Sequence, residues 1–379
     1  MEIYVVQRGD TVNSIANGFG VAVETVIVTN QLIYPYRLAV GQALLINDGI
    51  TNRDRYVDFN GFAYPFISSW VLENTLPYLT YLSVFSYGFT REGYLVYPQL
   101  ADEWMIELAG QFETIPILTL TPLDELGRFN NNLITSIVNS TEYTNRLIEE
   151  LLYVLESKGY GGVDVDFEYI KQEDRDLFTA FVVELHSRLS AQGYTVSVDL
   201  APKTSANQPG LLYAGKDYAA LGATADWVLL MTYEWGYKYG PPMAVAPINK
   251  VRQVVEYAVT EIDNRKINLG IPNYGYDWPL PFIQGETAAT TLGNVEAVQI
   301  AVNQGVEIQY DEISQSPFFY YTENGLEHVV WFEDVRSMRA KFDLIKEFNL
   351  RGGGYWTVMS WFYANWVLAD STFSINKKI

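Results

Sequence analysis

The sequence predicts an α/β protein in which strands and helices alternate along most of the chain. From about residue 57 onward, short apolar runs alternate with longer segments of helical periodicity. Eight such runs are present, and helices separate them, which is typical of a closed barrel of parallel strands. We therefore expect a (β/α)₈ barrel, the TIM-barrel architecture. Its strands are expected at residues 61–66, 81–87, 114–121, 162–169, 195–201, 227–233, 267–274 and 353–358.

The helical segments between these runs carry one apolar face each. Residues 142–158 place Leu147, Leu151 and Leu155 on one stripe, and Gly159 supplies the stop. The interval between the seventh and eighth strands is longer than the others. We expect an inserted α+β subdomain at about residues 279–331, forming one wall of the cleft, with short strands at 305–310, 318–322 and 328–332.

The strand expected at 162–169 carries three acids. Side chains alternate along a strand, so Asp164, Asp166 and Glu168 share one face, about 6–7 Å apart. Carboxylates so placed repel one another and are costly to desolvate. Structural pairing and a cation are alternatives, but the sequence lacks loop-type metal-ligand spacing. Acid–base chemistry fits best, with Glu168 nearest the end of the strand that meets substrate.

Composition excludes several classes of partner. The 379 residues carry a formal charge of −20, which argues against nucleic acid. Cysteine is absent, so disulfides and thiolate metal sites are excluded, and we expect neither metal nor cofactor. No signal peptide or membrane-spanning run is visible, so we expect no membrane partner. We also expect the protein to be a monomer. The 28 Tyr and 9 Trp suit either core packing or the stacking of sugar rings.

Residues 1–47 form a separate small unit, followed by a polar linker at 48–56. Asp10 is expected to cap a first helix whose apolar face includes Val12 and Ile15. Propensity alone favours a strand at 24–30, where β-branched residues are frequent. The unit nevertheless resembles a LysM module in residues 4–15, Thr29-Asn30 and 40–46. That resemblance implies a βααβ fold with a helix at 24–30, and binding to glycans that contain N-acetylglucosamine.

Several aromatic side chains lie at the ends of the expected barrel strands, where catalytic residues collect. They are Phe85, Tyr87, Tyr233, Trp235, Tyr274, Tyr276 and Trp356. Core or rim packing is the alternative for each of them. Tyr233 is the most suggestive, because it ends a strand with a hydroxyl beside Glu234.

The barrel unit, residues 57–379, resembles glycoside hydrolase family 18. Its acidic Asp-x-Asp-x-Glu signature matches Asp164, Asp166 and Glu168, and its Met-x-Tyr-acid motif matches Met231, Tyr233 and Glu234. Residues 85–89 and Trp356 also fit. Two positions depart from the family pattern: Gly161 stands where Asp or Asn is common, and Glu234 stands where Asp is common.

The resemblance implies a retaining, substrate-assisted mechanism in which the sugar's 2-acetamido oxygen attacks the anomeric carbon. Glu168 would act as the acid and base, Asp166 would orient the acetamido group, and Asp164 would share a proton. Tyr233 would donate to the acetamido oxygen. Trp356 would form the floor of the pocket, and Glu234, Tyr87, Phe85, Tyr274 and Trp235 would contact substrate. The resemblance also implies a cis bond between Trp356 and Thr357.

More narrowly, residues 331–337 and the LysM fusion resemble spore peptidoglycan N-acetylglucosaminidases. We therefore expect hydrolysis of N-acetylglucosaminyl β-1,4 bonds in spore cortex peptidoglycan, by a protein of the spore coat or cortex. A chitinase-like enzyme is the alternative within that class. A catalytically silent glycan-binding protein and a structural spore-coat protein are further alternatives, which the intact acids disfavour. The sequence leaves exo or endo cleavage open.

Overall fold

Eight parallel strands close into a barrel in the computed structural model, which describes residues 1–377. Each strand pairs with its sequence neighbour in the barrel, and the eighth returns to pair with the first. The expected fold class is therefore confirmed. The barrel strands are β3 (Tyr56–Ala63), β4 (Tyr81–Phe89), β6 (Ile115–Leu120), β7 (Gly162–Val165), β8 (Thr195–Leu200), β9 (Trp227–Leu230), β10 (Ile267–Pro272) and β16 (Gly352–Trp356).

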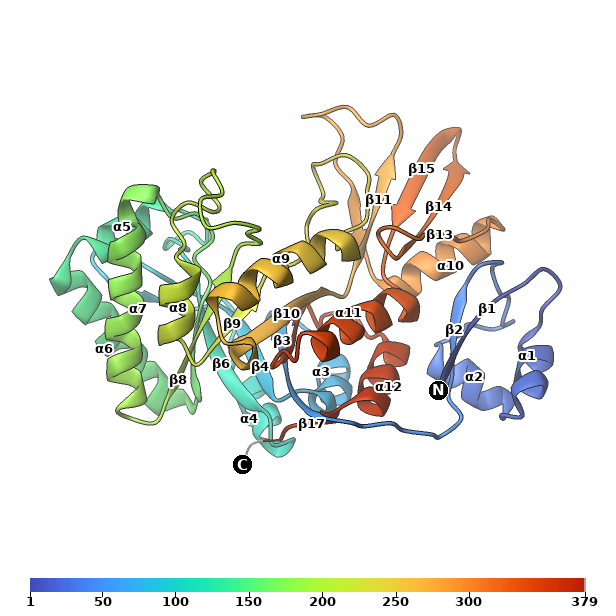
Figure 1. The fold of residues 1–379 in the computed structure, drawn as a ribbon, viewed down its shortest axis with the longest axis horizontal. Coiled ribbons are helices and arrows are strands. Elements are labelled where there is room, and N and C mark those ends of the chain that lie inside the picture. Colours follow the sequence, from blue (N-terminus) through green and yellow to red (C-terminus); the bar gives the residue numbers. More distant parts are fainter. Residues whose placement is uncertain (378–379) are drawn as a thin grey trace.

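Helices surround this barrel, as Figure 1 shows. The 18-residue α6 (Thr141–Lys158) begins after Ser140, whose side chain accepts a bond from the Tyr143 amide, and it ends at the left-handed Gly159. The other helices around the barrel are α3 (Ser69–Thr75), α4 (Glu103–Gln111), α5 (Asn132–Val138), α7 (Arg175–Ser190), α8 (Tyr218–Thr224), α9 (Ile248–Glu261), α11 (Val335–Glu347) and α12 (Tyr363–Thr372), with short 3₁₀ turns at Leu76–Tyr78, Gln172–Asp174 and Asn264–Lys266. Two short strands, β5 (Leu95–Val96) and β17 (Ser374–Ile375), extend the sheet.

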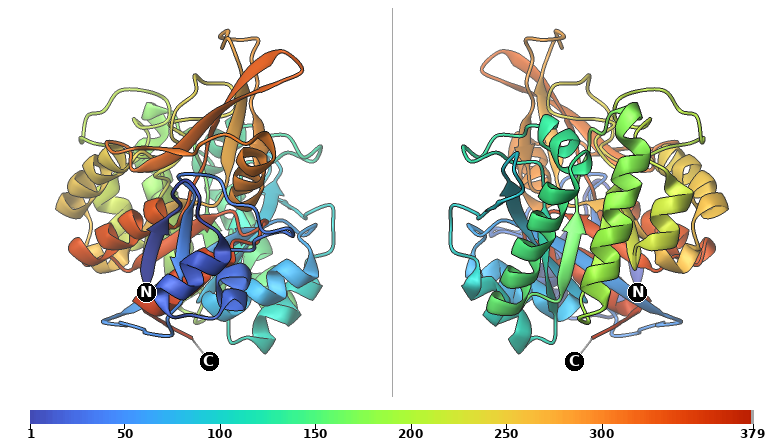
Figure 2. Two further views of the ribbon diagram at one scale, coloured as in Figure 1. Left: turned by 90° about the vertical axis from the view of Figure 1, so that its right-hand side faces the viewer. Right: turned by 90° about the vertical axis from the view of Figure 1, so that its left-hand side faces the viewer.

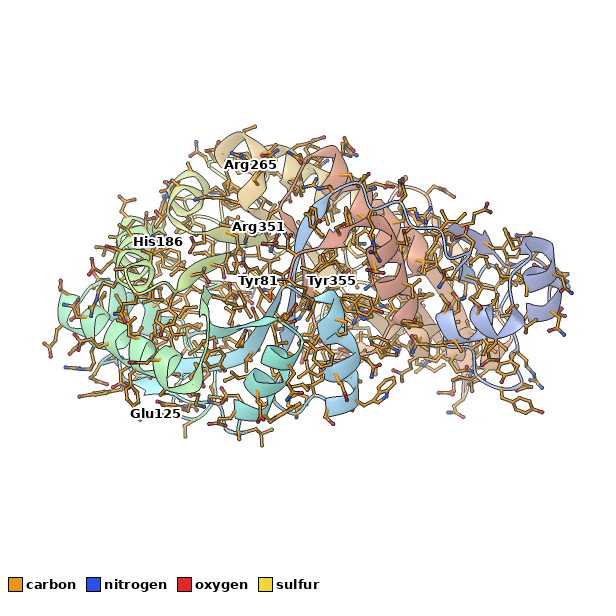
Figure 3. All side chains as sticks on the ribbon, turned by 90° about the horizontal axis from the view of Figure 1, so that it is seen from below. Tyr81, Glu125, His186, Arg265, Arg351 and Tyr355 are labelled. Carbon is orange, nitrogen blue, oxygen red and sulfur yellow. The ribbon has the colours of Figure 1, made fainter. Side chains whose placement is uncertain are left out.

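The closed bottom of the barrel is sealed by aromatic and cationic side chains. Tyr81 and Trp227 stack with ring centroids 4.5 Å apart, and the Arg351 guanidinium lies 5.0 Å from the Trp227 ring. Arg351 also forms an ion pair with Asp58 at 2.6 Å. Figure 3, a view from below, labels Tyr81 and Arg351 near the centre of the barrel. The opposite end of the barrel is therefore the one open to substrate.

An inserted sheet stands above that open end, between the seventh and eighth barrel strands (Figure 1). It consists of β11 (Gly275–Pro279), β12 (Thr290–Leu292), β13 (Gln309–Asp311), β14 (Ser316–Glu323) and β15 (Leu326–Trp331), with α10 (Asn294–Gln304) beside it. The strand expected at 305–310 is wrong for its first half, because Gly305 ends α10 in the left-handed conformation and β13 starts only at Gln309.

The N-terminal unit has the order β1 (Glu2–Val5), α1 (Val12–Phe19), α2 (Val23–Thr29), β2 (Ala43–Ile46), with its strands antiparallel. The helix at 24–30 that the LysM resemblance implied is confirmed, against local propensity. The expected cap is wrong: Thr11, not Asp10, caps α1, and Asp10 instead accepts bonds from the Tyr4 hydroxyl and the Gln7 amide. Across residues 1–377 no single helix is long and apolar enough to cross a membrane, although α1 and α2 together, bent by 111°, satisfy that test of length and composition.

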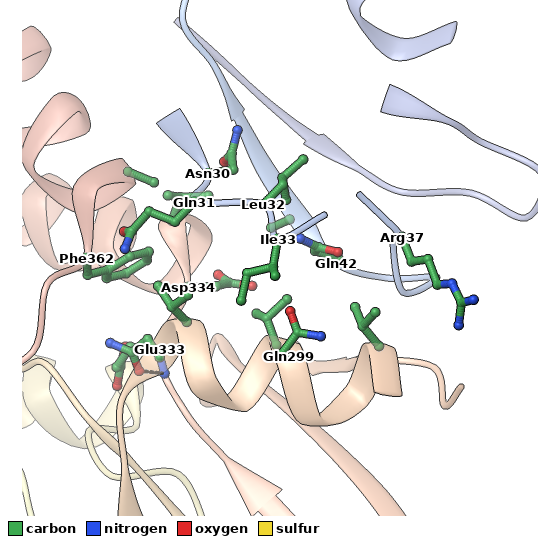
Figure 4. Close-up of a pocket in the computed structure, with 17 residues that line it drawn as sticks. Asn30, Gln31, Leu32, Ile33, Arg37, Gln42, Gln299, Glu333, Asp334 and Phe362 are labelled. Carbon is green, nitrogen blue, oxygen red and sulfur yellow. Dashed lines mark hydrogen bonds between the residues drawn. The ribbon is translucent and has the colours of Figure 1, made fainter. Parts of the chain in front are cut away.

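This small unit packs directly against the rest of the molecule. Figure 1 shows it at the right, beside α10 and α12, and the left view of Figure 2 shows it in front. The Gln31 side chain accepts from the Tyr363 amide at 2.6 Å and donates to the Trp361 carbonyl at 3.3 Å. The Ile308 amide donates to the Val40 carbonyl at 2.9 Å. Figure 4 shows this seam, a tight cavity of about 40 Å³ in which Gln31, Leu32 and Ile33 approach Gln299 and Phe362.

Candidate active site

The acidic row lies where β7 ends at the open mouth of the barrel. The strand expected at 162–169 stops at Val165, so Asp166 and Glu168 lie in the segment that follows it. The Asp166 amide still donates to the Leu120 carbonyl at 3.0 Å, which keeps this segment in line with β6. Asp164 and Asp166 are buried, whereas Glu168 is partly exposed and lines a cavity of about 470 Å³. The row therefore runs from the core into the cleft.

The carboxyls of two deeply buried aspartates, Asp164 and Asp199, act on one another. Asp164 accepts from the Ser197 hydroxyl at 2.5 Å and is hydrogen-bonded to Asp199. Among the described residues, one oxygen of each carboxyl is buried without a donor. A proton shared between the two carboxyls would supply that donor. Burial raises the pKa of Asp164 to about 6, and burial together with the Asp164 charge raises the pKa of Asp199.

The two acids nearest the cavity also hold protons more tightly than isolated carboxyls. Burial raises the pKa of Asp166, and the neighbouring Glu168 charge adds to that effect. Burial likewise raises the pKa of Glu168, while the positive charge of Lys216 lowers it. A carboxyl that holds its proton to higher pH than an isolated one, and opens into a cavity, can donate a proton to a leaving oxygen. Glu168 has both properties.

The facing wall of the cavity carries Tyr233, Glu234 and Trp235, which follow β9. Glu234 has a backbone φ of 65° and accepts hydrogen bonds from the hydroxyls of Tyr274 and Tyr276. Partial desolvation raises the pKa of Glu234, although both tyrosines oppose that shift. Two hydroxyls thus hold the Glu234 carboxyl in place beside Tyr233, which leaves its second oxygen for a ligand.

Trp356, the last residue of β16, lines the same cavity. Its ring centroid lies 4.9 Å from that of Phe85 and 6.2 Å from that of Tyr64. The expected cis bond between Trp356 and Thr357 is confirmed, and a second one joins Phe85 to Ser86. Phe85 and Tyr64 also line a neighbouring cavity of about 370 Å³, with Phe66, Tyr97 and Phe129 among its other side chains. Aromatic side chains therefore line both the catalytic cavity and the neighbouring cavity, on either side of this cluster.

Tyr87 does not reach the cleft, which corrects its expected contact with substrate. Its side chain is fully buried on the outer side of β4, and its hydroxyl donates to Asp102 at 2.5 Å. The Lys158 ammonium and the Tyr160 hydroxyl meet the same aspartate. Residues two apart on a regular strand share a face, but the register of β4 against β6 shifts between Val84 and Tyr87, which breaks that alternation. Phe85 points inward and Tyr87 outward.

The sequence reasoning missed several residues of the site. Asp199 and Ser197 lie on one face of β8, and the alternation within residues 195–200 could have revealed them. Tyr169, Tyr213 and Tyr237 line the cavity from loops that carry no recognisable pattern. The Gly161 position, where the family pattern was not met, has a packing reason, because a Cβ there would lie 2.3 Å from the Ile115 side chain.

A barrel with an acid at the mouth of its fourth strand, a Tyr-acid pair after the sixth and a tryptophan ending the eighth defines a glycoside hydrolase. The chain belongs to glycosyl hydrolases family 18, whose model matches residues 127–360, and a LysM domain model matches residues 4–47. Among curated proteins, it is similar to the cortical fragment-lytic enzyme of Bacillus subtilis (strain 168), with 39% identity over 100% of this chain and 99% of that protein.

Solved structures give the same picture. The spore cortex-lytic enzyme SleL of Bacillus megaterium QM B1551 matches with a TM-score of 0.93 and 32% identity, over 100% of this chain and 99% of that one. The spore cortex-lytic enzyme SleL of Bacillus cereus matches with a TM-score of 0.82 and 37% identity, over 99% of this chain and 87% of that one. The family resemblance read from the motifs is confirmed.

Proposed function

We propose that this enzyme hydrolyses N-acetylglucosaminyl β-1,4 bonds in peptidoglycan of the spore cortex, with retention of configuration. The observation that carries the proposal is the acidic row itself, in which Glu168, whose pKa is raised by burial, faces a cavity of about 470 Å³ above buried Asp166. The full-length similarity to cortical fragment-lytic and spore cortex-lytic enzymes supports the choice of substrate and a location in the spore.

The proposed chemistry assigns one step to each acid. Glu168 protonates the leaving glycosidic oxygen while the substrate's acetamido oxygen attacks the anomeric carbon and forms an oxazolinium ion. Asp166 orients the acetamido N–H and stabilises the positive intermediate, and Asp164 shares its proton with Asp199. Glu168 then removes a proton from water, which attacks the anomeric carbon and opens the intermediate. Net retention follows from two displacements at one carbon.

The remaining cavity residues hold the substrate in this proposal. Tyr233 donates to the acetamido oxygen, and Trp356 forms the floor beneath the sugar ring. Glu234, held by Tyr274, accepts from the sugar, while Trp235 and Phe85 supply flanking aromatic surface. Glu234 is longer than the aspartate common in the family, and the two tyrosine hydroxyls on its carboxyl fit that extra reach.

We further propose that residues 1–47 anchor the enzyme to glycan, that 48–56 form the connection, and that 57–379 form the catalytic unit with its insertion at about 279–331. The LysM match over residues 4–47 supports the anchoring role. In this proposal the enzyme works as a monomer on a glycan partner, without nucleic acid or a membrane.

The test compares wild type with Glu168→Gln on cortex peptidoglycan and on chitin oligomers, with products analysed by mass spectrometry. We expect new N-acetylglucosamine reducing ends from cortex, and a loss of turnover by about 10²–10⁴-fold in Glu168→Gln with glycan binding retained. Glu173→Gln, on an exposed turn of the same connection, is the matched control and should keep full turnover.

Three outcomes would contradict this proposal. Near-normal turnover of Glu168→Gln would remove this residue from the role of acid. Cleavage of chitin oligomers with no product from cortex would replace the substrate with a chitin-like polymer, and binding without any product would replace hydrolysis with glycan recognition.

A further inference from the structure

A lysine lies completely buried beneath the acidic row. Lys216 is 1% exposed, and its ammonium donates to the Asp199 backbone carbonyl at 2.8 Å. Burying an ammonium is costly unless opposite charge or hydrogen bonds compensate for the lost water. The proposed catalytic steps do not use this residue, so its burial needs another explanation.

The loop between β8 and α8 holds Lys216 in this place. A second buried lysine, Lys203, donates to the carbonyls of Ala206 and Lys216, each at 3.0 Å, and so fixes the loop from within. Gly215 packs so closely that a Cβ there would lie 2.3 Å from the Ile170 carbonyl oxygen. Since Ile170 follows the acidic row by two residues, the loop presses Lys216 against the segment that carries Glu168.

The charges around Lys216 come from three directions. Asp166 and Glu168 on the segment after β7, and Asp199 on β8, each act on the Lys216 charge. Tyr233, in the connection that follows β9, is affected by the charges of the same three carboxyls.

The other charges on its own loop are engaged elsewhere. Asp217 forms an ion pair with Arg175 at 2.5 Å, and Lys203 is bound to carbonyls. Among the described residues, no carboxylate oxygen lies within 4.0 Å of the Lys216 ammonium. The Lys216 charge therefore acts on the three carboxyls together and not on a single ion-pair partner.

We propose that Lys216 is a positioning residue of the catalytic centre, whose buried ammonium is the countercharge that sets how many carboxyls of the acidic row are ionised at once. The proposal rests on the catalytic roles proposed above. Without that charge, four neighbouring carboxyls would share the site with no cation, and each would keep its proton to higher pH. Asp166 would then be neutral when it is needed as an anion beside the oxazolinium ion.

The Lys216 charge shifts the pKa values of the neighbouring carboxyls in the direction that this proposal requires. Lys216 lowers the pKa of Asp166, Glu168 and Asp199, in each case against the larger effect of burial. Burial lowers the pKa of Lys216 itself, and the charges of the three carboxyls oppose that shift. The cation and the acids thus stabilise one another's charged forms.

The test is the pH dependence of turnover in Lys216→Met, which removes the charge and keeps an unbranched side chain of similar length. The acid limb should move upward because Asp166 ionises later, and the alkaline limb should move upward because Glu168 keeps its proton longer. We expect both limbs of kcat/KM on cortex peptidoglycan fragments to move to higher pH by about one unit or more. Lys203→Met is the matched control, since it removes a buried lysine of the same loop whose ammonium is hydrogen-bonded to two carbonyls.

The control separates charge from support of the loop. If Lys203→Met lowers the rate but leaves both limbs in place, while Lys216→Met moves them, the proposal holds. Unmoved limbs in Lys216→Met, or equal shifts in both variants, would overturn it.

A second measurement needs no turnover and stays informative if cortex peptidoglycan is not the substrate. The carboxyls have raised pKa values in the folded state, so they contribute stability that is lost as pH rises through those values. Raising the values further in Lys216→Met should make the fall in the thermal unfolding midpoint between about pH 5 and pH 8 steeper than in wild type. Parallel curves in the two proteins would overturn the proposal whatever the substrate proves to be.

Discussion

Two buried aspartates show how hydrogen-bond donors decide the chemistry of a carboxyl. Burial acts to raise the pKa of Asp102, but the Lys158 ammonium and the hydroxyls of Tyr160 and Tyr87 together hold it below its usual value. Asp164 is equally enclosed and receives the Ser197 hydroxyl, and its pKa rises to about 6. The first aspartate is therefore stabilised as an anion, whereas the second holds its proton to higher pH than an isolated aspartate does.

This contrast predicts the behaviour of Tyr87→Phe. The variant should keep wild-type kcat/KM, because the hydroxyl lies outside the cleft, and it should lose about 1–2 kcal/mol of unfolding free energy, because buried Asp102 loses a donor. Denaturant unfolding and steady-state kinetics measure the two effects. Tyr97→Phe, with a half-exposed ring near Tyr87, is the control. A tenfold loss of kcat in Tyr87→Phe would contradict the assignment.

Strand ends are where the sequence and the structure differ most. The fourth and sixth barrel strands were expected to reach residues 169 and 233, but they end at Val165 and Leu230. Apolar alternation continues through both connections, so periodicity alone cannot mark the ends. The side chains that face the cavity begin at these ends, where the backbone leaves the regular ladder.

Helix α2 illustrates the opposite case, in which tertiary contacts override local preference. Its β-branched residues favour a strand, yet the segment is helical. Asn30 explains part of this, because its side chain bonds the Val26 carbonyl and both backbone groups of Leu45 on β2. These hydrogen bonds join residues that are 15 positions apart in the sequence. The family resemblance could predict the helix, whereas local propensity could not.

The seam between the LysM unit and the insertion gives a prediction at the scale of elements. Gly41 has a φ of 82°, and a Cβ there would lie 1.8 Å from the Ile308 carbonyl oxygen. Gly41→Ala should therefore separate the two units, which limited proteolysis of residues 48–55 would detect as faster cleavage. Gly20→Ala is the matched control, since its φ of 67° carries a similar backbone cost but its Cβ would meet nothing within 4 Å. Equal proteolysis of both variants would contradict the role of this contact.

At the scale of the whole molecule, the barrel and the acidic row could be predicted, but the contacts between distant segments could not. Glu168, Asp166 and Asp164 were recognisable because one short segment of the sequence carries them in a fixed pattern. Lys216 and the Gln31 contacts with residues 361–363 join segments that no periodicity relates. Such contacts depend on how loops fold back over the barrel, which a single sequence does not encode in a readable form.

The net charge of −20 predicts how salt affects substrate binding. Glycan fragments that carry peptide carboxylates are repelled by this field, and added salt screens the repulsion. Raising the salt from about 0.05 M to about 0.5 M should lower the KM for such fragments by about two- to fivefold. Neutral N-acetylglucosamine oligomers serve as the control substrate and should show no such change. An equal response of both substrates would assign the effect to something other than charge.

The connection between the two units is bound to the barrel by hydrogen bonds and ion pairs at several residues. The Asn52 amide donates to the Ser371 carbonyl at 2.8 Å, Arg53 pairs with Asp370 at 2.6 Å, and Asp54 pairs with Lys346 at 2.8 Å. A flexible tether would let a hydrolase sample many bonds around its point of attachment. Here the distance between a sugar bound by the N-terminal unit and the acid at Glu168 is fixed by the fold. The enzyme would therefore cut a glycan strand at a set distance from the sugar to which it is anchored.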